Sequence, residues 1–278
     1  MKKITAIMLS VLTAFVFAVA PVMAQTVTET EKIVVTTGHM NGWDMMGSVT
    51  FSNEQKPPQL IGNGSAKLMV EGEEPGMDDG ARLHTDKYDG MMLSDITALM
   101  YSIYIPTDED KAPYLSMSID TDGDATTVED TLEFMPVGLT PGAWQEINAM
   151  LGQWTVNGEL PTMTLAEYLV LEGNEDAKII SDGDVGGLSI VAGYMADMTG
   201  WENFMGYVDK VLINNDLYNF EPTVNTPPTN KDMCKEGMWQ VYTNPMYKNQ
   251  GACVSSMAKK TPTPAGLMQK VLNMFKNK

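Results

Sequence analysis

The feature that most constrains the fold of this chain is an alternation of apolar and polar residues, which dominates residues 30–220. Successive side chains of a β-strand point to opposite faces, so a two-residue period predicts half-buried strands. The clearest examples are Ser48–Phe51, Ala66–Val70, Leu99–Ile105, Leu188–Ala192 and Tyr207–Ile213. Clusters of Gly, Asp, Asn and Pro separate these segments and predict turns between them.

One short helix is predicted within this region. Thr164 and Glu167 form a capping box, with the hydroxyl at the N-cap and the carboxylate three residues later. The helix should continue to about Leu171 and end near Gly173. Many short strands with a single helix predict an all-β protein, an antiparallel jelly-roll β-sandwich spanning residues 25–222.

The N-terminus has the pattern of a secretory signal peptide. Lys2 and Lys3 precede the apolar, uncharged segment Ile4–Ala20, and small residues at Val22 and Ala24 predict cleavage after Ala24. No later segment is long and apolar enough for a transmembrane helix. We therefore expect residues 1–24 to be removed and the protein to be secreted, to the periplasm, the cell surface or the medium.

The charge of the chain argues against a nucleic-acid partner. Asp and Glu number 36 against 18 Lys and Arg, a formal net charge of −18, and most carboxylates precede residue 229. Binding to phosphate backbones depends on clustered cations, which this region lacks. An acidic surface favours solubility or attracts divalent cations. It is equally consistent with a generally acidic protein whose carboxylates form no specific site.

The C-terminal region has its own organisation. Residues 223–230 read as a linker, and Cys234 and Cys253 follow within a tail spanning 231–258. Two cysteines at this spacing in a secreted chain predict a disulfide, worth on the order of 3 kcal/mol in the chain-entropy model. Residues 259–278 are expected to be either a short amphipathic helix or a loosely ordered terminus.

A predicted hairpin, Tyr114–Met135, contains the densest group of carboxylates. Apolar residues alternate on both flanks, and the loop between them carries Asp120, Asp122, Asp124, Glu129 and Asp130. Carboxylates two residues apart in a turning loop can converge on Ca²⁺, which takes six to eight oxygen ligands. The loop departs from the EF-hand pattern, because Thr131 stands where that pattern has its last carboxylate. A solvated acidic loop is the alternative.

The last strand of this region carries a short motif, Gly206-Tyr207-Val208-Asp209-Lys210-Val211. Together with Gly42-Trp43, the loop at 120–124 and Pro141-Gly142-Ala143-Trp144, it resembles secreted jelly-roll modules of the carbohydrate-binding kind, both concanavalin-like and galactose-binding-like. The resemblance covers most of residues 38–214. It implies a sandwich fold, a glycan ligand and a structural calcium ion to which Asp209 contributes.

Tryptophans are the side chains best suited to stack on sugar rings. Trp154 and Trp201 lie in segments rich in Gly, Asn and Asp, so they are the expected ligand-binding residues. Packing in the core is the competing reading for both.

The tail carries a second resemblance. Its pattern begins Lys231-Asp232-x-Cys234-Lys235-x-Gly237-x-Trp239 and ends Lys248-Asn249-Gln250-Gly251-x-Cys253-Val254. It is similar to a short paired-cysteine module at the C-termini of many uncharacterised secreted bacterial proteins, and no activity follows from it.

Catalytic motifs find little support. The chain has two histidines, and neither is near a serine in a nucleophile-elbow pattern. We therefore expect a non-catalytic module that binds a polysaccharide or another cell-surface component, with a structural calcium ion. The alternatives are an adhesion or structural protein that binds no sugar, and a sandwich-fold glycoside hydrolase or lyase. The sequence leaves the oligomeric state open.

Overall fold

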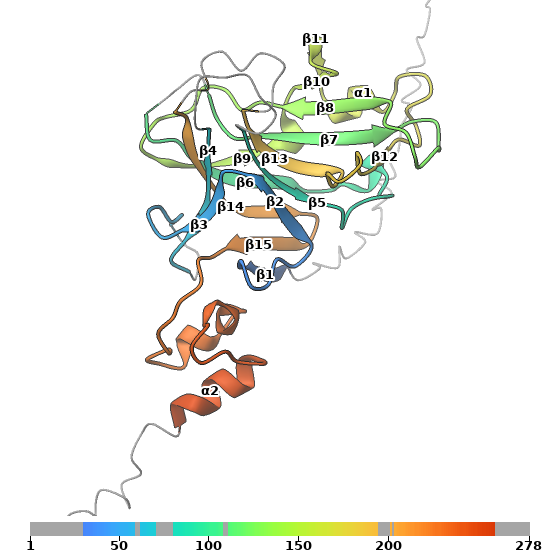
Figure 1. Ribbon diagram of the computed structural model, residues 1–278. Helices are drawn as coiled ribbons and strands as arrows, with labels where there is room; N and C mark the ends of the chain where they lie inside the picture. The colour runs from blue at the N-terminus through green and yellow to red at the C-terminus, as the bar shows by residue number, and fades with distance from the viewer. Residues whose placement is uncertain are drawn as a thin grey trace, which may run out of the picture.

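The computed structural model describes residues 30–58, 62–70, 80–107, 111–193, 201 and 203–258. The predicted leader at 1–24 and the terminal segment at 259–278 lie outside these residues. The described chain forms a β-sandwich of two sheets and, below it in Figure 1, a small C-terminal module. This confirms the predicted all-β class.

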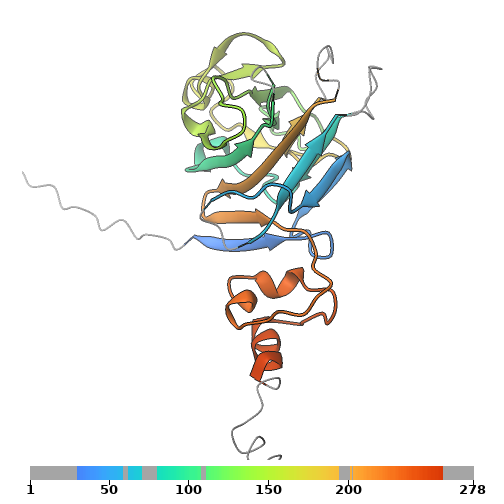
Figure 2. The same ribbon diagram turned by 90° about the vertical axis from the view of Figure 1, so that its left-hand side faces the viewer.

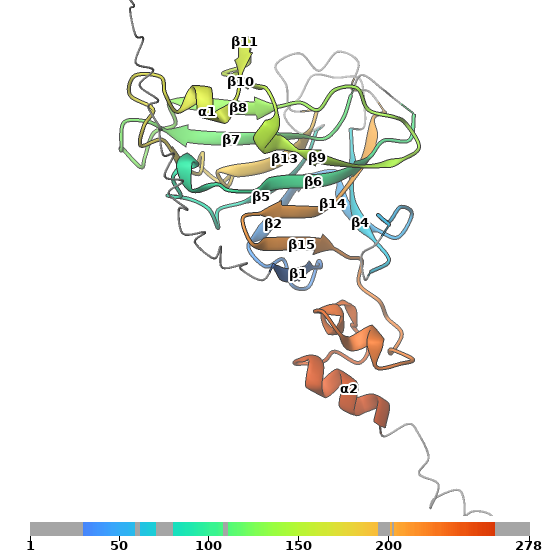
Figure 3. The same cartoon turned by 180° about the vertical axis from the view of Figure 1, so that it is seen from behind.

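Seven strands form one sheet: β1 (Glu31–Val35), β3 (Val49–Ser52), β4 (Ser65–Met69), β6 (Leu99–Tyr104), β9 (Trp144–Asn148), β14 (Met205–Ile213) and β15 (Asp216–Phe220). The long strand β14 is central. It pairs with β6 along one side, and on the other side with β4 near its start and β15 near its end. Strands β9, β6, β14, β15 and β1 follow one another toward the C-terminal module (Figure 3).

Eight strands form the second sheet: β2 (Trp43–Gly47), β5 (Ala81–Thr85), β7 (Tyr114–Asp120), β8 (Asp130–Phe134), β10 (Trp154–Val156), β11 (Glu159–Met163), β12 (Lys178–Ile179) and β13 (Leu188–Ala192). The pairings in both sheets are antiparallel apart from β1 with β15, which is parallel. The predicted hairpin is present as β7 and β8, with Leu115 opposite Phe134.

One segment of the chain passes from one sheet to the other. Strands β2 and β3 belong to different sheets, and Ser48 alone lies between them. Gly47 ends β2 with φ of 69°, a left-handed conformation that residues with a Cβ adopt only with strain. This bend lets a nearly continuous strand contribute to both layers.

The core lies between the two sheets. The inward side chains of β7, including Met117 and Ile119, meet those of β6, including Tyr101 and Ile103, and all four residues are at most 1% exposed. Trp43 packs edge-on against Tyr218 and Phe220 at the end nearer β1. The alternation read from the sequence therefore assigns the inner face correctly.

The predicted helix exists but is shorter than expected. Helix α1 (Leu165–Tyr168) begins at Thr164, whose hydroxyl accepts the N–H of Glu167, and the Glu167 carboxylate accepts the N–H of Thr164. The helix ends after a single turn rather than near Leu171. The chain continues as turns to Gly173, which has φ of 94°.

The C-terminal module contains three short elements: the 3-10 helices η3 (Asp232–Cys234) and η4 (Met238–Val241), and helix α2 (Gln250–Ala258). The predicted disulfide joins Cys234 in η3 to Cys253 in α2. Val34 of β1 packs into the same apolar cluster as both cysteines, and Lys32 pairs with Glu236. The module therefore covers the β1 side of the sandwich, as Figure 2 also shows.

Candidate functional site

The outer face of the seven-stranded sheet carries a row of aromatic side chains. Trp144 of β9 lies opposite Tyr104 of β6, and Tyr104 lies opposite Tyr207 of β14. Ring centroids are 5.8 Å apart for Trp144 and Tyr104 and 5.9 Å apart for Tyr104 and Tyr207. Trp144 and Tyr104 are partly exposed, whereas Tyr207 is buried.

Tyr207 is fixed by charged neighbours. Its hydroxyl donates to the Glu54 carboxylate at 2.6 Å, and Lys67 donates to the same oxygen at 2.8 Å. The hydrogen bond from Lys67, and then that from Tyr207, lowers the pKa of Glu54. Burial and the Glu54 carboxylate raise the pKa of Tyr207, so this phenol remains protonated and anchors one end of the row.

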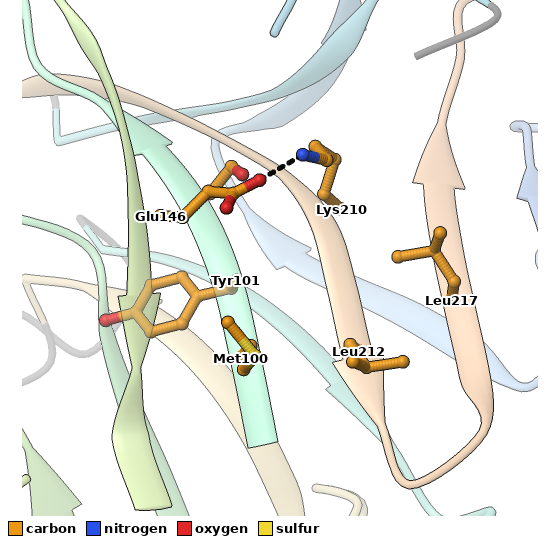
Figure 4. Close-up of a pocket in the computed structure, with 7 residues that line it drawn as sticks. Met100, Tyr101, Glu146, Lys210, Leu212 and Leu217 are labelled. Carbon is orange, nitrogen blue, oxygen red and sulfur yellow. Dashed lines mark hydrogen bonds and ion pairs between the residues drawn. The ribbon is translucent and has the colours of Figure 1, made fainter. Parts of the chain in front are cut away.

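A charged bridge crosses the same face two residues further along the strands. Ser102 of β6 has Glu146 of β9 as its register partner, and the Lys210 ammonium of β14 pairs with the Glu146 carboxylate. Ser102 lies between them and is 2% exposed, because the bridge passes over it. Figure 4 shows the ion pair spanning β9, β6 and β14.

Lys210 reaches the outer face because β14 contains a bulge. Asp209 lies opposite Ser102 and Leu212 lies opposite Met100, so β14 has one residue more than β6 between the two pairs. Lys210 has φ of 52°, which is unusual for a residue with a side chain. Strained backbone of this kind is concentrated at functional sites.

Asp209 begins this bulge, and it does not lie with the other predicted metal ligands. It is fully buried, and its Oδ1 accepts the N–H of Phe220 at 2.8 Å, while burial raises the pKa of its carboxyl and interaction with the Lys210 backbone lowers it. Its Oδ2 has no partner among the described residues. Asp209 lies in a different sheet from the aspartate loop, so the two do not form one metal site, and a calcium role for Asp209 stays a prediction.

Apolar side chains form the next row. Met100 of β6 lies opposite Leu212 of β14, and Leu212 lies opposite Leu217 of β15. All three residues are partly exposed. The outer face therefore presents an aromatic row, a charged bridge and an aliphatic row in succession.

The bridge separates two hollows. One, of about 150 Å³, is lined by Pro57, Pro58, Ser102, Trp144, Gln145, Glu146 and Lys210. The other, of about 120 Å³, is lined by Met100, Tyr101, Ser102, Glu146, Lys210, Leu212 and Leu217 (Figure 4). Both hollows share Ser102, Glu146 and Lys210, so they flank the same ion pair.

The two tryptophans predicted to bind a ligand are both in the interior. Trp154 is 0% exposed, and its indole N–H donates to the carbonyl of Ala149 at 3.1 Å. Trp201 is 4% exposed and packs against Tyr114 and Phe204. Neither ring offers a free face to a sugar, so the alternative reading, core packing, is correct for both. The accessible tryptophan on the sheet is Trp144.

The loop between β7 and β8 gathers part of the predicted metal site. One carboxylate oxygen from each of Asp120, Asp122 and Glu129 lies within 4.8 Å of the others. Each carboxylate is also oriented by a backbone N–H: Gly123 donates to Asp120, Asp124 to Asp122, and Thr121 to Glu129. Asp120 is 4% exposed. The chemistry fits a hard cation that binds oxygen ligands.

Asp124 and Asp130 have other partners. Asp124 accepts the N–H and the hydroxyl of Thr126, at 3.1 and 2.7 Å. Asp130 accepts the Asn157 amide at 2.7 Å and the Tyr168 hydroxyl at 2.6 Å, which connects the hairpin to α1. Of the five carboxylates that the sequence places in this loop, the structure therefore brings Asp120, Asp122 and Glu129 together and gives Asp124 and Asp130 other partners.

The eight-stranded sheet brings a serine, a histidine and an aspartate into register without forming a triad. Ser189, His84 and Asp44 are Cα partners across β13, β5 and β2. The Gly186 N–H donates to His84 Nδ1 at 2.9 Å, so the ring proton is on Nε2. Burial lowers the pKa of His84, which keeps it neutral. In this tautomer His84 has no free nitrogen to accept the Ser189 proton.

Comparison with known proteins gave no assignment: no family model matches the chain, and no curated protein matches it. Of the helices in the described ranges, none has both the length and the apolarity that crossing a membrane requires.

Proposed function

We propose that this protein is a secreted, non-catalytic module that binds a glycan on the outer face of its seven-stranded sheet. The observation that carries the proposal is the partly exposed Trp144–Tyr104 pair beside two hollows that share Ser102, Glu146 and Lys210.

This combination matches the two needs of sugar recognition. The C–H faces of a sugar ring pack on aromatic rings, and its hydroxyls require donors and acceptors at fixed positions. Trp144 supplies the ring, Glu146 an acceptor and Lys210 a donor. A sheet face also holds these groups more rigidly than a loop does.

The alternative of a glycoside hydrolase receives less support from this face. Such enzymes use two carboxylates on opposite sides of the scissile bond. Among the residues that line the two hollows, Glu146 is the single carboxylate, and Lys210 neutralises it. An adhesion protein without sugar binding remains the other alternative, which the following experiment tests.

The test is a glycan array probed with the mature chain and two variants. Trp144→Ala removes the exposed ring from the sheet. Trp239→Ala is the matched control, because Trp239 is also partly exposed but lies in the C-terminal module. The proposal predicts binding that Trp144→Ala reduces at least tenfold and Trp239→Ala leaves unchanged. Equal loss in both variants, or no binding to any glycan, would contradict it.

We further propose that Asp120, Asp122 and Glu129 hold a structural Ca²⁺, with remaining ligands from backbone carbonyls and water. The convergence of the three carboxylates supports this assignment. The ion would fix the β7–β8 loop and take no part in sugar binding, since these residues are on the other sheet from the hollows.

Secretion is part of the same proposal. The leader pattern at residues 1–24 supports it, and so does the disulfide, because such bonds persist in oxidising compartments. Detection of a chain that begins at Gln25 outside the cytoplasm would test it.

A further inference from the structure

The charged bridge restricts which ligands the outer face can accept. Lys210 is 17% exposed and Glu146 is 61% exposed, so the carboxylate is the more accessible partner. An anionic ligand would meet Glu146 and an ammonium that is already neutralised. A cationic ligand would compete for Glu146 and leave Lys210 unpaired in a half-buried position. An uncharged ligand can hydrogen-bond to both groups without breaking the pair.

The aliphatic row adds a second restriction. Met100, Leu212 and Leu217 come from three neighbouring strands and form one wall of the hollow on the far side of the bridge from Trp144. Polar hydroxyls gain nothing in contact with such a surface, whereas a methyl group is transferred out of water there. The hollow therefore favours a ligand with a small apolar substituent next to its hydroxyls.

From these contacts we infer that the ligand is a neutral glycan whose rings carry an apolar substituent such as an acetyl group. This inference rests on the proposed function and specifies its ligand class. A ring stacks on Trp144, hydroxyls bond to Glu146 and Lys210 across the bridge, and the substituent of a neighbouring ring enters the hollow beside Leu212.

The test uses four oligosaccharides with the same β-1,4-linked glucose-type backbone. Cello-oligosaccharides are neutral without a substituent, and N-acetylglucosamine oligomers are neutral with an acetyl group. Glucosamine oligomers are cationic, and glucuronic acid oligomers are anionic. Calorimetric titration should give the tightest binding for the acetylated series, about fourfold above the cello series, the factor expected for burying one methyl group. Both charged series should bind more weakly than the cello series.

Two variants and one control variant locate the effect. Leu212→Thr should remove the preference, so that the acetylated series and the cello series bind with similar affinity. Leu160→Thr is its control, because Leu160 is 81% exposed on β11, in the other sheet. Glu146→Gln leaves Lys210 without its partner and should raise affinity for the anionic series severalfold.

The outcomes separate this inference from the proposed function. Tighter binding of a charged series, or an acetyl preference that survives Leu212→Thr, would overturn the inference while Trp144-dependent binding stands. The same holds if none of the four series binds although another glycan binds through Trp144. If no glycan binds through Trp144, both the inference and the proposed function fail.

Discussion

Asp209 shows how a single buried carboxylate can position a site that it does not touch. Its Oδ1 accepts the N–H of Phe220 and its carboxylate interacts with the backbone of Lys210, which stabilises the bulge that directs Lys210 outward. The sequence motif predicts a calcium ligand at Asp209 and gives no sign of its contacts with the backbone of β14 and β15. The position of a bulge depends on how β14 pairs with β6. This register cannot be predicted from the sequence of β14 alone.

Burial raises the pKa of Asp209 well above its ordinary value. The folded protein therefore retains this proton at pH values where the unfolded chain, with a pKa near 4, has lost it. Folded protein binds more protons in that window, so the free energy of unfolding should fall as pH rises above about 4. Each unit of pKa difference contributes about 1.4 kcal/mol.

Asp209→Asn removes this titration while keeping an acceptor for the Phe220 N–H. Urea unfolding between pH 4 and 8 should show a smaller decline in the free energy of unfolding for Asp209→Asn than for the parent chain. Identical slopes in the two proteins would show that Asp209 does not titrate in this way.

Trp154 and Trp144 have different expected roles, one in core packing and the other in ligand binding, and their substitution should affect stability differently. Trp154→Ala should lower the free energy of unfolding by about 3–5 kcal/mol, because it empties a fully buried site beside Phe134. Trp144→Ala should cost clearly less, since its ring is partly exposed. Chemical denaturation of both variants measures the difference. A larger loss for Trp144→Ala would mean that this ring is structural.

At the scale of elements, the hairpin loop is where the calcium proposal can be tested. For an extracellular site of ~10⁻⁴–10⁻³ M affinity, 10 mM Ca²⁺ should raise the melting temperature by roughly 3–10 °C. Asp120→Asn should abolish this rise, and Asp124→Asn should retain it, because Asp124 is bonded to Thr126 instead. Differential scanning calorimetry in the presence of Ca²⁺ and of EGTA measures this shift. If the melting temperature of the parent chain is the same in both, the calcium site is rejected.

The C-terminal module is the other separable element. Removing the disulfide with Cys253→Ser should destabilise residues 231–258 by about 3 kcal/mol in the chain-entropy model. The sandwich has its own core and should remain folded. Hydrogen exchange should then increase in η3, η4 and α2 only. Faster exchange in β7 and β13 as well would show that the module and the sandwich unfold together.

Strands in which apolar and polar residues alternate clearly could be predicted from the sequence, whereas short or mostly polar strands could not. Strands β4, β6, β7, β13 and β14 follow the expected segments closely. Strand β9 was missed because its sequence, Trp-Gln-Glu-Ile-Asn, lacks a clear apolar face at a sheet edge. That omission mattered, since β9 supplies Trp144 and Glu146. Helix α1 was predicted too long because local capping signals set its start but not its end.

At the scale of the whole molecule, the fold class and the disulfide could be predicted from the sequence. The position of the candidate site could not. Its residues extend from Pro57 to Leu217 and come from four strands and a loop. Strand register alone brings them together. The sequence analysis predicted ligand binding at Trp154 and Trp201 instead, because their segments are rich in Gly, Asn and Asp. Sandwich interiors also require large aromatic side chains, and both rings are buried there.

The central claim, that ligands bind on the outer face at Trp144, can be tested by one NMR titration. The chain has five tryptophans, and each indole N–H gives a separate ¹⁵N-correlated signal. We predict that the tightest-binding glycan from the array shifts the Trp144 indole signal, assigned with Trp144→Phe, and leaves those of Trp154 and Trp201 in place. A titration that moves Trp154 or Trp201 but not Trp144 would contradict the claim.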